Sequence, residues 1–415
     1  HWVAKGFVLP DRENTRMMEE RGGKYLRILL QSSLLEKVGD EGSTYYKMHD
    51  LVHDFAKSIL NPESSNQDRY LALDSSKGLE ENTIRTIPAS IRTLFLHVEG
   101  GISTDMLLRF KCLNVLRLSG YDVESLPSSI GKLLHLRLLD ISFSRITSLP
   151  ESLCKLYNLQ TLTINVNALK GGFPKGMSDL ISLRHLNYYD YDAELKMPAQ
   201  MGRLTCLQTL EFFNVSQERG RGIEELGTLK YLKGSLSIRN LGLVKGKEAA
   251  KQAKLFEKPN LCRLAFEWES GDRESDNREE DVLEGLQPHP KLQRLGIDSF
   301  MGNKFPQWLI NLSKLEALEI IGCKRCSELP SLGQLPSLKR LYLIGLDNIR
   351  SIGDEFYASG SSTRKRKFFP ALEVLYVEYM ENLVEWKDAD QVRSTVGEAE
   401  TDTGQGRSSD SDDRP

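Results

Sequence analysis

A leucine phrase recurs along this chain about every 23 residues, and no other feature limits the possible folds so strongly. The phrase L-x-x-L-x-L at residues 113–118 returns at 136–141 and at 159–164, with isoleucine in its last place. Further copies begin at Leu183, Leu207, Leu261, Leu292, Leu315, Leu338 and Leu372. A period in the low twenties with this phrase predicts an α/β repeat solenoid, a leucine-rich repeat horseshoe of about eleven or twelve repeats.

Each phrase alternates apolar and variable positions, as a half-buried strand does. The fixed apolar side chains are expected to face the core, and the residues between them to face outward. One strand cannot bury its own apolar edge, so neighbouring repeats must stack. A buried leucine contributes roughly 1.5–3 kcal/mol, so the stacked repeats build a large core.

A proline follows many of these phrases at a nearly constant distance. It stands 14 or 15 residues after the first leucine of the repeat and directly behind Leu, Phe or Met. The six prolines of this kind are Pro127, Pro150, Pro174, Pro198, Pro306 and Pro330. Proline lacks an N–H and has a fixed φ, so it predicts an irregular return segment rather than a second strand.

Composition argues against several classes of protein. The net charge is −3 with 27% charged residues, so the chain has no basic bias and nucleic acid is not the expected partner. No apolar run approaches about 18 residues, and no membrane span is expected. The segment from His1 does not resemble a secretory signal, and it lacks Met, so we expect the chain to be cut from a longer protein.

The six cysteines do not suggest a disulfide framework. Cys323-x-x-Cys326 is the only close pair, and one such pair is weak evidence for zinc or redox chemistry. We expect Cys323 to pack against the turn after its strand, where these repeats often carry Asn or Cys. This cysteine usage favours the reducing cytoplasm.

The first sixty residues have a different periodicity. Residues 16–35 and 48–60 each place apolar side chains on one helical face, and residues 43–47 are rich in strand-forming types. This order predicts the end of a winged-helix domain over residues 1–61 and a connector over 62–82. The repeats then cover 83–388, and an acidic, disordered tail covers 389–415.

Two other readings of the first domain stay open. The segment His49-Asp50-Leu51-Val52-His53 nearly matches the zinc-protease motif H-E-x-x-H, but it has Asp for Glu and no evident third ligand. A winged helix can also bind DNA, but the helix over 48–60 carries two aspartates and only one lysine.

The residues around these motifs resemble one family. The runs Trp2–Val8, Leu34-Leu35 and Met48–Asp54 are similar to the end of the NB-ARC module of plant intracellular immune receptors. The Leu-Pro repeats are similar to the leucine-rich region of the same receptors. Gly234–Leu241 and Glu328–Lys339 resemble the class that has an N-terminal coiled coil.

The resemblance implies a nucleotide switch that is only partly present. It implies that His49 senses the β-phosphate of ADP, with Met48 as an apolar anchor and Asp50 as an orienting neighbour. The phosphate cradle G-x-x-x-x-G-K-[ST] is absent from these residues, as are the acidic residues that would hold magnesium. We therefore expect no cofactor in this chain alone, although ADP or ATP with magnesium is expected in the parent receptor.

The outward strand positions are the expected partner surface, because exposed aromatic residues and arginines dominate binding hot spots. The predicted members of this surface are Arg117, Tyr189, Phe213, Arg263, Arg294, Arg340, Tyr342 and Tyr376. The expected partners are proteins: a pathogen effector, a guarded host protein or the receptor's own nucleotide-binding domain. A basic run at Arg364–Lys367 leaves a nuclear location open.

These features predict the sensor and autoinhibitory part of a plant immune receptor, and not an enzyme. The first alternative is a stand-alone repeat adaptor or scaffold, which leaves the Met-His-Asp segment unexplained. The second is an enzyme that uses His49 and Asp50, but the sequence offers no nucleophile to accompany them.

Overall fold

A computed structural model describes the chain in twelve stretches. They are residues 18–38, 45–52, 54, 70–75, 87–98, 107–120, 123–165, 169, 172–189, 195–269, 278–357 and 368–387. The chain divides into two compact units, His1–Pro198 and Ala199–Pro415, and each is described by itself. The predicted tail over 389–415, His53 and the basic run at Arg364–Lys367 lie outside the described residues.

The first unit begins with a helix and a hairpin. Helix α1 spans Met18–Gln31, and strands β1 (Leu35–Val38) and β2 (Tyr45–Met48) pair antiparallel, with Leu35 opposite Met48. Glu19 and Glu20 lie in the first turn of α1, where negative charge favours the helix dipole. Residues 50–52 begin another helical segment. This order is that of the predicted winged-helix end.

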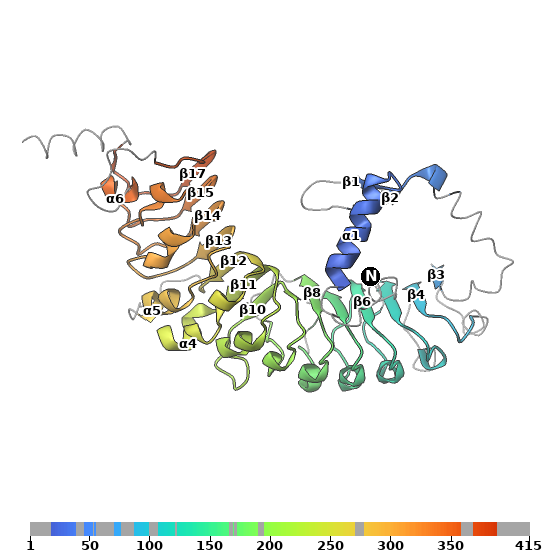
Figure 1. Ribbon diagram of the computed structural model, residues 1–415. Helices are drawn as coiled ribbons and strands as arrows, with labels where there is room; N and C mark the ends of the chain where they lie inside the picture. The colour runs from blue at the N-terminus through green and yellow to red at the C-terminus, as the bar shows by residue number, and fades with distance from the viewer. Residues whose placement is uncertain are drawn as a thin grey trace, which may run out of the picture. The chain divides into compact units, whose positions relative to one another are not determined.

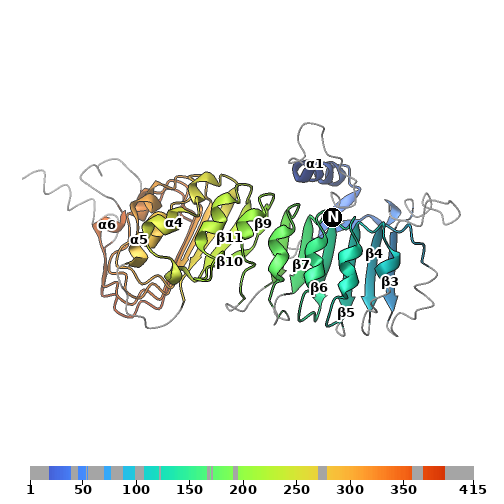
Figure 2. The same cartoon turned by 90° about the horizontal axis from the view of Figure 1, so that it is seen from below.

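The repeats of the first unit supply one parallel strand each. The strands are β3 (Tyr70–Ser75), β4 (Thr93–Val98), β5 (Val115–Gly120), β6 (Leu138–Ser144), β7 (Thr161–Asn165) and β8 (His185–Tyr189). They pair in chain order, and Figures 1 and 2 show β4 to β7 side by side with short helices on the opposite side. The sheet begins at β3, inside the segment that the sequence suggested as a connector. Tyr70–Leu73 carries an apolar pattern without the full leucine phrase, so its strand was not predicted.

The second unit repeats the same construction. Its strands are β9 (Thr209–Leu210), β10 (Phe212–Asn214), β11 (Gly234–Arg239), β12 (Leu261–Glu267), β13 (Arg294–Asp298), β14 (Ala317–Ile321), β15 (Arg340–Ile344), β16 (Ser351–Ile352), β17 (Val374–Glu378) and β18 (Glu385–Trp386). Strands β10 to β15 and β17 form a parallel sheet in chain order, and β16 pairs with β18. The described residues of this unit also form three α-helices: α4 (Lys247–Lys251), α5 (Arg278–Gly285) and α6 (Asp354–Tyr357).

The prolines mark where the return segments begin. Pro127, Pro150, Pro174 and Pro306 each precede a short 3₁₀ helix and have φ between −60° and −71°. Their carbonyls accept hydrogen bonds from the N–H groups three residues later, at 3.0–3.2 Å. The missing N–H of proline costs nothing at the start of a helix. The predicted change from strand to return segment is therefore confirmed at these positions.

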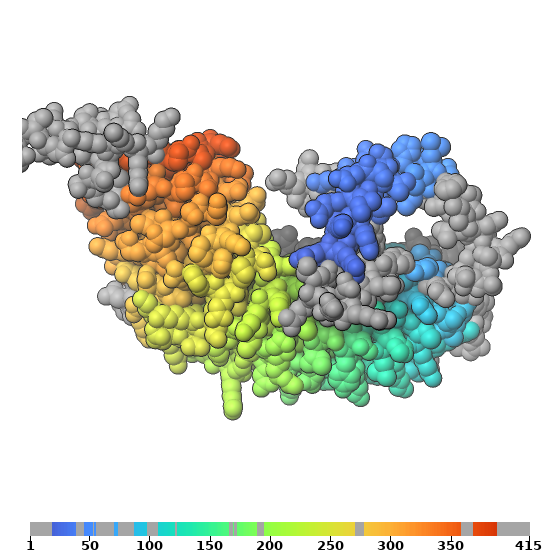
Figure 3. Space-filling model, viewed as in Figure 1, coloured from blue at the N-terminus to red at the C-terminus, as the bar shows by residue number. Residues whose placement is uncertain are grey.

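The leucines of successive phrases form continuous buried rows. In the second unit, paired strands align Leu264, Leu295, Leu318 and Leu341, each no more than 1% exposed. The equivalent row of the first unit contains Leu94, Leu116, Leu139, Leu162 and Leu186, all 0% exposed. Figure 3 shows the repeats of each unit packed against their neighbours in chain order. No helix of the described residues has the length and apolar character of a membrane span.

Candidate protein-binding surface

The second unit presents a regular set of outward side chains, which we call the outward grid. It comprises the three positions of strands β12, β13, β14, β15 and β17 that alternate with the buried rows. The first row is Arg263, Arg294, Ala317, Arg340 and Val374; the second is Ala265, Gly296, Glu319, Tyr342 and Tyr376; the third is Glu267, Asp298, Ile321, Ile344 and Glu378. Five of the eight predicted partner residues therefore lie on one surface.

The aromatic part of the outward grid is a tyrosine pair on neighbouring strands. The rings of Tyr342 and Tyr376 lie 6.0 Å apart at 46°, a tilted arrangement that aromatic pairs favour. The hydroxyl of Tyr376 donates to Oε2 of Glu378 at 2.6 Å. The neighbouring Glu378 carboxylate raises the pKa of Tyr376, so the hydroxyl stays protonated as a donor. Tyr376 is 43% exposed and is available to a partner.

The acidic third row is largely engaged within the protein. The carboxylate of Glu267 accepts a hydrogen bond from the Ser237 hydroxyl and pairs with Nε of Arg239 at 3.1 Å. The Arg239 guanidinium also lies 4.4 Å from the ring centre of Phe212. These contacts engage the Glu267 carboxylate within the protein.

Phe213 does not belong to the partner surface, and this prediction is wrong. Its side chain is 0% exposed, and it pairs in register with the buried Ile238. A bend at Glu211 separates β9 from β10 and interrupts the expected alternation. A slip of one residue moves every following side chain to the other face, so Phe212 aligns with Ser237 in the outward register. Phe212 is itself buried, only 2% exposed, so neither phenylalanine is available to a partner.

In the first unit, Arg117 is held by two neighbours. Its Nε lies 3.5 Å from Oδ2 of Asp140, and its guanidinium lies 4.9 Å from the ring centre of Phe143. Tyr189 ends β8, but its side chain lies outside the described residues. The predicted residue Arg117 is therefore outward, but its charge is already met by an internal partner.

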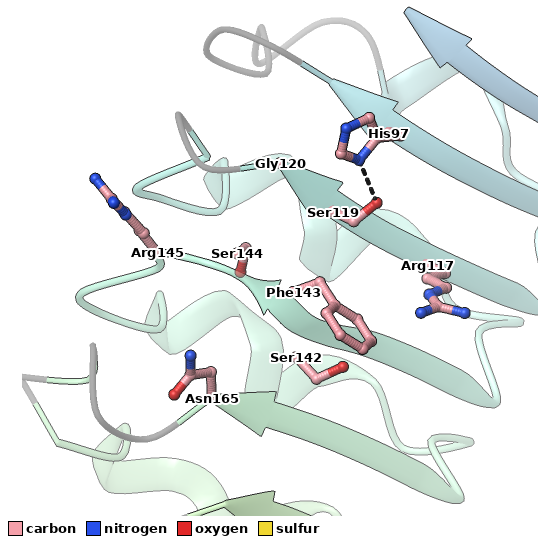
Figure 4. A pocket seen from close by; sticks show the side chains of 9 residues that line it. All are labelled: His97, Arg117, Ser119, Gly120, Ser142, Phe143, Ser144, Arg145 and Asn165. Carbon is pink, nitrogen blue, oxygen red and sulfur yellow. Dashed lines mark hydrogen bonds between the residues drawn. The ribbon is translucent and has the colours of Figure 1, made fainter. Parts of the chain in front are cut away.

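A pocket of about 510 Å³ lies beside Arg117, at the ends of strands β4 to β7. Most of its lining residues have polar or charged side chains, although more of the pocket surface is apolar than polar. Nδ1 of His97 lies 3.0 Å from the hydroxyl of Ser119. Figure 4 shows Phe143 directed toward Arg117, whereas the side chain of Arg145 points away from it. The two guanidinium groups therefore do not converge on one ligand position.

Phe143 is a candidate contact that sequence reasoning missed. Strand β6 contains one more residue than β5 between two paired positions, because Arg117 pairs with Asp140 and Ser119 pairs with Phe143. The extra residue is a local bulge, and bulges redirect side chains. It leaves Phe143 63% exposed, where simple alternation from Ile141 would place it in the core.

The Met-His-Asp segment lies at the end of β2. Met48 is 38% exposed, and His49 and Asp50 are exposed. Nδ1 of His49 accepts a hydrogen bond from the N–H of Leu51 at 3.4 Å, which helps to begin the helical segment at residue 50. Asp50 pairs with Lys47 at 3.7 Å. The exposed imidazole therefore has Nδ1 engaged, and none of the described residues binds its Nε2.

Helix α1 is linked to the repeats by a carboxylate. Oε1 of Glu19 lies 2.8 Å from Nη1 of Arg184 and 3.5 Å from Nε2 of His185, the first residue of β8. Burial alone would raise the pKa of Glu19, but the hydrogen bonds with His185 and Arg184 outweigh it and lower the pKa to about 2. Within the first unit, this cluster connects the winged-helix segment with the sheet.

The buried cysteines are packing groups. Sγ of Cys323 lies 3.5 Å from the carbonyl of Ile321, and Sγ of Cys326 lies 3.1 Å from that of Glu328. Burial raises the pKa of Cys326 to about 12 and that of Cys323 still further, so both thiols stay protonated. The expected packing of Cys323 against its turn is confirmed. No cluster of three or more metal-ligating side chains occurs among the described residues.

Two family models match separate parts of this sequence. The model described as the disease resistance protein winged helix domain matches residues 1–56, and that of the R13L1/DRL21 leucine-rich repeats matches residues 223–346. The first match covers α1, β1, β2 and the Met-His-Asp segment. The second covers strands β11 to β15, which carry most of the outward grid.

Several plant proteins are similar over most of the chain. Disease resistance protein RGA2 of Solanum bulbocastanum is 35% identical over 381 residues, 90% of this chain and 38% of that protein. RGA4 of the same plant is 37% identical over 386 residues, 92% of this chain and 37% of its own length. RPP13-like protein 1 of Arabidopsis thaliana is 33% identical over 433 residues, 96% of this chain and 40% of that protein.

The chain therefore spans about two fifths of the length of these relatives. Similarity runs through both the winged-helix segment and the repeats, and the order of the two is the same as in the fold described above. This chain belongs to the family of plant disease resistance proteins, with a winged-helix segment followed by leucine-rich repeats.

Proposed function

We propose that this chain is the sensor and autoinhibitory part of a plant intracellular immune receptor. Its repeats bind a pathogen effector or a guarded host protein, and they also restrain the receptor's own nucleotide-binding domain. The chain acts in the cytoplasm as a binding module and not as an enzyme. The outward grid carries this proposal, because it presents arginines and a tyrosine pair on a regular surface, and such residues dominate binding hot spots.

The restraint would pass through the contact between α1 and β8. A partner that competes for Arg184 or His185 would release Glu19, whose carboxylate has no other ion pair among the described residues. Because the side chain of Glu19 is only 16% exposed, its release would leave a poorly solvated charge and favour movement of the helix. In this way binding at the repeats would be coupled to the winged-helix segment.

The nucleotide-sensing role of Met48, His49 and Asp50 also remains a proposal. It requires ADP, or ATP with magnesium, held by a domain outside these residues. The hydrogen bond that Nδ1 of His49 accepts from Leu51 favours the tautomer with the proton on Nε2. That N–H can donate to a phosphate, the group that a bound nucleotide would supply.

The partner-binding proposal can be tested by proximity labelling in leaf tissue. The chain, fused to a biotin ligase, would be compared with a Tyr342→Ala/Tyr376→Ala variant and with a Tyr157→Ala/Phe256→Ala control. Both control residues are more than half exposed and lie outside the outward grid. Candidate partners are then purified and their dissociation constants measured.

The proposal predicts a partner whose affinity falls about tenfold or more with the tyrosine variant and is unchanged with the control. If every purified partner binds the two variants equally well, recognition does not use the outward grid and the proposal fails.

A further inference from the structure

The first row of the outward grid contains three arginines, which we call the arginine row. Arg263 and Arg294 lie directly opposite each other on β12 and β13, and Arg340 follows two strands later on β15. Like charges that face each other on neighbouring strands oppose folding. Such an arrangement needs nearby negative charge to be favourable, which either the protein's own carboxylates or a partner can supply.

The described residues do not supply that charge. Arg263, Arg294 and Arg340 form no ion pair or side-chain hydrogen bond with any described residue. Of the nearby carboxylates, Glu316 pairs with Lys339 at 3.4 Å. Glu319 lies on the intervening strand β14 but is not within ion-pair distance of either neighbouring arginine.

The carboxylates of the third row are engaged elsewhere. Glu267 pairs with Arg239, Glu378 accepts from the Tyr376 hydroxyl, and Asp298 accepts from Ser299 at 2.8 Å. The charges of the arginine row are therefore not met by the described residues, and a ligand that complements the row must be acidic.

The residues around the arginine row are small. Ala317 separates Arg294 from Arg340 within the row and is only 3% exposed. Ala265 and Gly296 stand beside Arg263 and Arg294 in the second row. No side chain longer than a methyl group rises at these three positions, so the main chain of a ligand can approach the sheet there.

We infer that the arginine row binds an extended acidic segment of a partner protein, lying across strands β12 to β15. Neighbouring strands are about 4.8 Å apart, so Arg294 and Arg340 are separated by about 10 Å at the backbone. An extended segment rises about 3.4 Å per residue, so carboxylates about three residues apart match this spacing. Each guanidinium can hold a carboxylate through two parallel hydrogen bonds. This inference rests on the proposed function and adds the chemistry of the partner.

The inference also predicts the direction in which the segment continues. Beyond Arg340, the second row ends in the Tyr342 and Tyr376 rings. An apolar or aromatic residue that follows the acidic stretch would pack against them. The partner segment is thus acidic over β12 to β15 and apolar at β17.

The test measures binding of labelled synthetic peptides to the purified chain by fluorescence anisotropy. One peptide has aspartate at every third position and a terminal phenylalanine. A second has lysine in place of aspartate, and a third has the same composition with its aspartates adjacent. A single-stranded oligonucleotide of equal charge is the fourth probe.

Two variants of equal charge separate the arginine row from general electrostatics. The first is Arg263→Gln/Arg294→Gln/Arg340→Gln. The control is Lys291→Gln/Lys314→Gln/Lys324→Gln, which removes three exposed lysines outside the strands of the grid. Thermal unfolding of both variants checks that they remain folded, and an Arg→Lys version of the triple variant retains the charge without the paired hydrogen bonds.

We expect the spaced aspartate peptide to bind about tenfold more tightly than the lysine peptide and the adjacent-aspartate peptide. The arginine variant should lose this preference, the Arg→Lys version should lose part of it, and the lysine control should keep it. Equal binding of all peptides, tighter binding of the oligonucleotide, or an equal loss in both glutamine variants would overturn the inference. A protein partner that needs Tyr342 and Tyr376 but not the arginines would sink this inference and leave the proposed function standing.

Discussion

Replacing Lys258 by methionine should stabilise the second unit. Lys258 follows a 3₁₀ helix (Leu255–Glu257) and is 1% exposed, and its Nζ has no hydrogen-bond partner among the described residues. Burial of the ammonium group lowers its pKa from the ordinary value of 10.5 to about 8. Methionine has a similar unbranched shape and no charge, so it fills the same space without this cost.

The size and the pH dependence of the effect follow from the two pKa values. The difference between 10.5 and about 8 corresponds to about 3 kcal/mol of destabilisation while the amine is charged in both the folded and the unfolded chain. Below pH 8 this cost is complete. Between about pH 8 and 10.5 the unfolded chain binds more protons than the folded one, so stability rises with pH. At pH 9 about 1 kcal/mol of the cost is already recovered.

The assay is urea unfolding under reducing conditions at pH 7 and pH 9, followed by the fluorescence of Trp268 and Trp308, which are buried in the same unit. The variant should exceed the wild type by about 3 kcal/mol at pH 7 and by about 2 kcal/mol at pH 9. Lys245→Met removes an exposed lysine of the same unit and should change stability by less than about 0.5 kcal/mol. A difference between Lys258→Met and wild type that is absent, or that does not shrink with pH, would refute the argument.

Three further outcomes are expected. Glu19→Gln should speed hydrogen exchange in α1 at pH 7. In the wild type, the same loosening of α1 should appear as the pH falls from about 4.5 toward 2, because a carboxylate whose pKa is lowered in the folded chain stabilises the fold only above that range. Phe213→Ala should lower the free energy of unfolding in urea by about 3–5 kcal/mol, and Phe143→Ala should lower it by less than about 0.5 kcal/mol. The reverse order would mean that Phe143 is buried and Phe213 exposed, which contradicts the structure. In the folded chain, iodoacetamide should modify exposed Cys112, Cys206 and Cys262 long before Cys323 and Cys326, as followed by mass spectrometry; equal rates would mean that the two buried thiols are accessible.

Much of the fold could be predicted because the repeat specifies it several times over. The spacing of the leucines aligns Leu295, Leu318 and Leu341 in a single row, and each copy of the phrase predicts the same strand and the same buried positions. The proline that follows six of the phrases then fixes the start of a return segment, since its missing N–H and fixed φ suit that place. Errors arose only where a strand departs from this period.

Phe213 and Phe143 illustrate that limit. The prediction of Phe213 and the omission of Phe143 both depend on counting in twos along a strand, and a bend at Glu211 or an extra residue in β6 changes the count by one. These irregularities are set by how a strand pairs with its neighbour, which a single phrase does not encode. For the same reason, the residues of β3 were assigned to a connector, because the place of this strand in the sheet comes from pairing with β4.

The sequence predicted which arginines of the candidate site point outward, but not which of them form ion pairs within the protein. Arg117 and Arg294 are both outward arginines in the sequence pattern, yet Arg117 pairs with Asp140 and Arg294 pairs with no described residue. That distinction depends on which side chains meet across strands, and it decides which arginines are available to a partner. It is therefore information that only the three-dimensional arrangement supplies.

The most direct test of the central claim is hydroxyl-radical footprinting of the purified chain with and without a protein partner identified by proximity labelling. The account predicts that oxidation of Tyr342 and Tyr376 falls when the partner binds, while Phe256 and Tyr157, both more than half exposed elsewhere, are oxidised as before. Unchanged oxidation of the tyrosine pair, with protection confined to Phe256 or Tyr157, would contradict recognition through the outward grid.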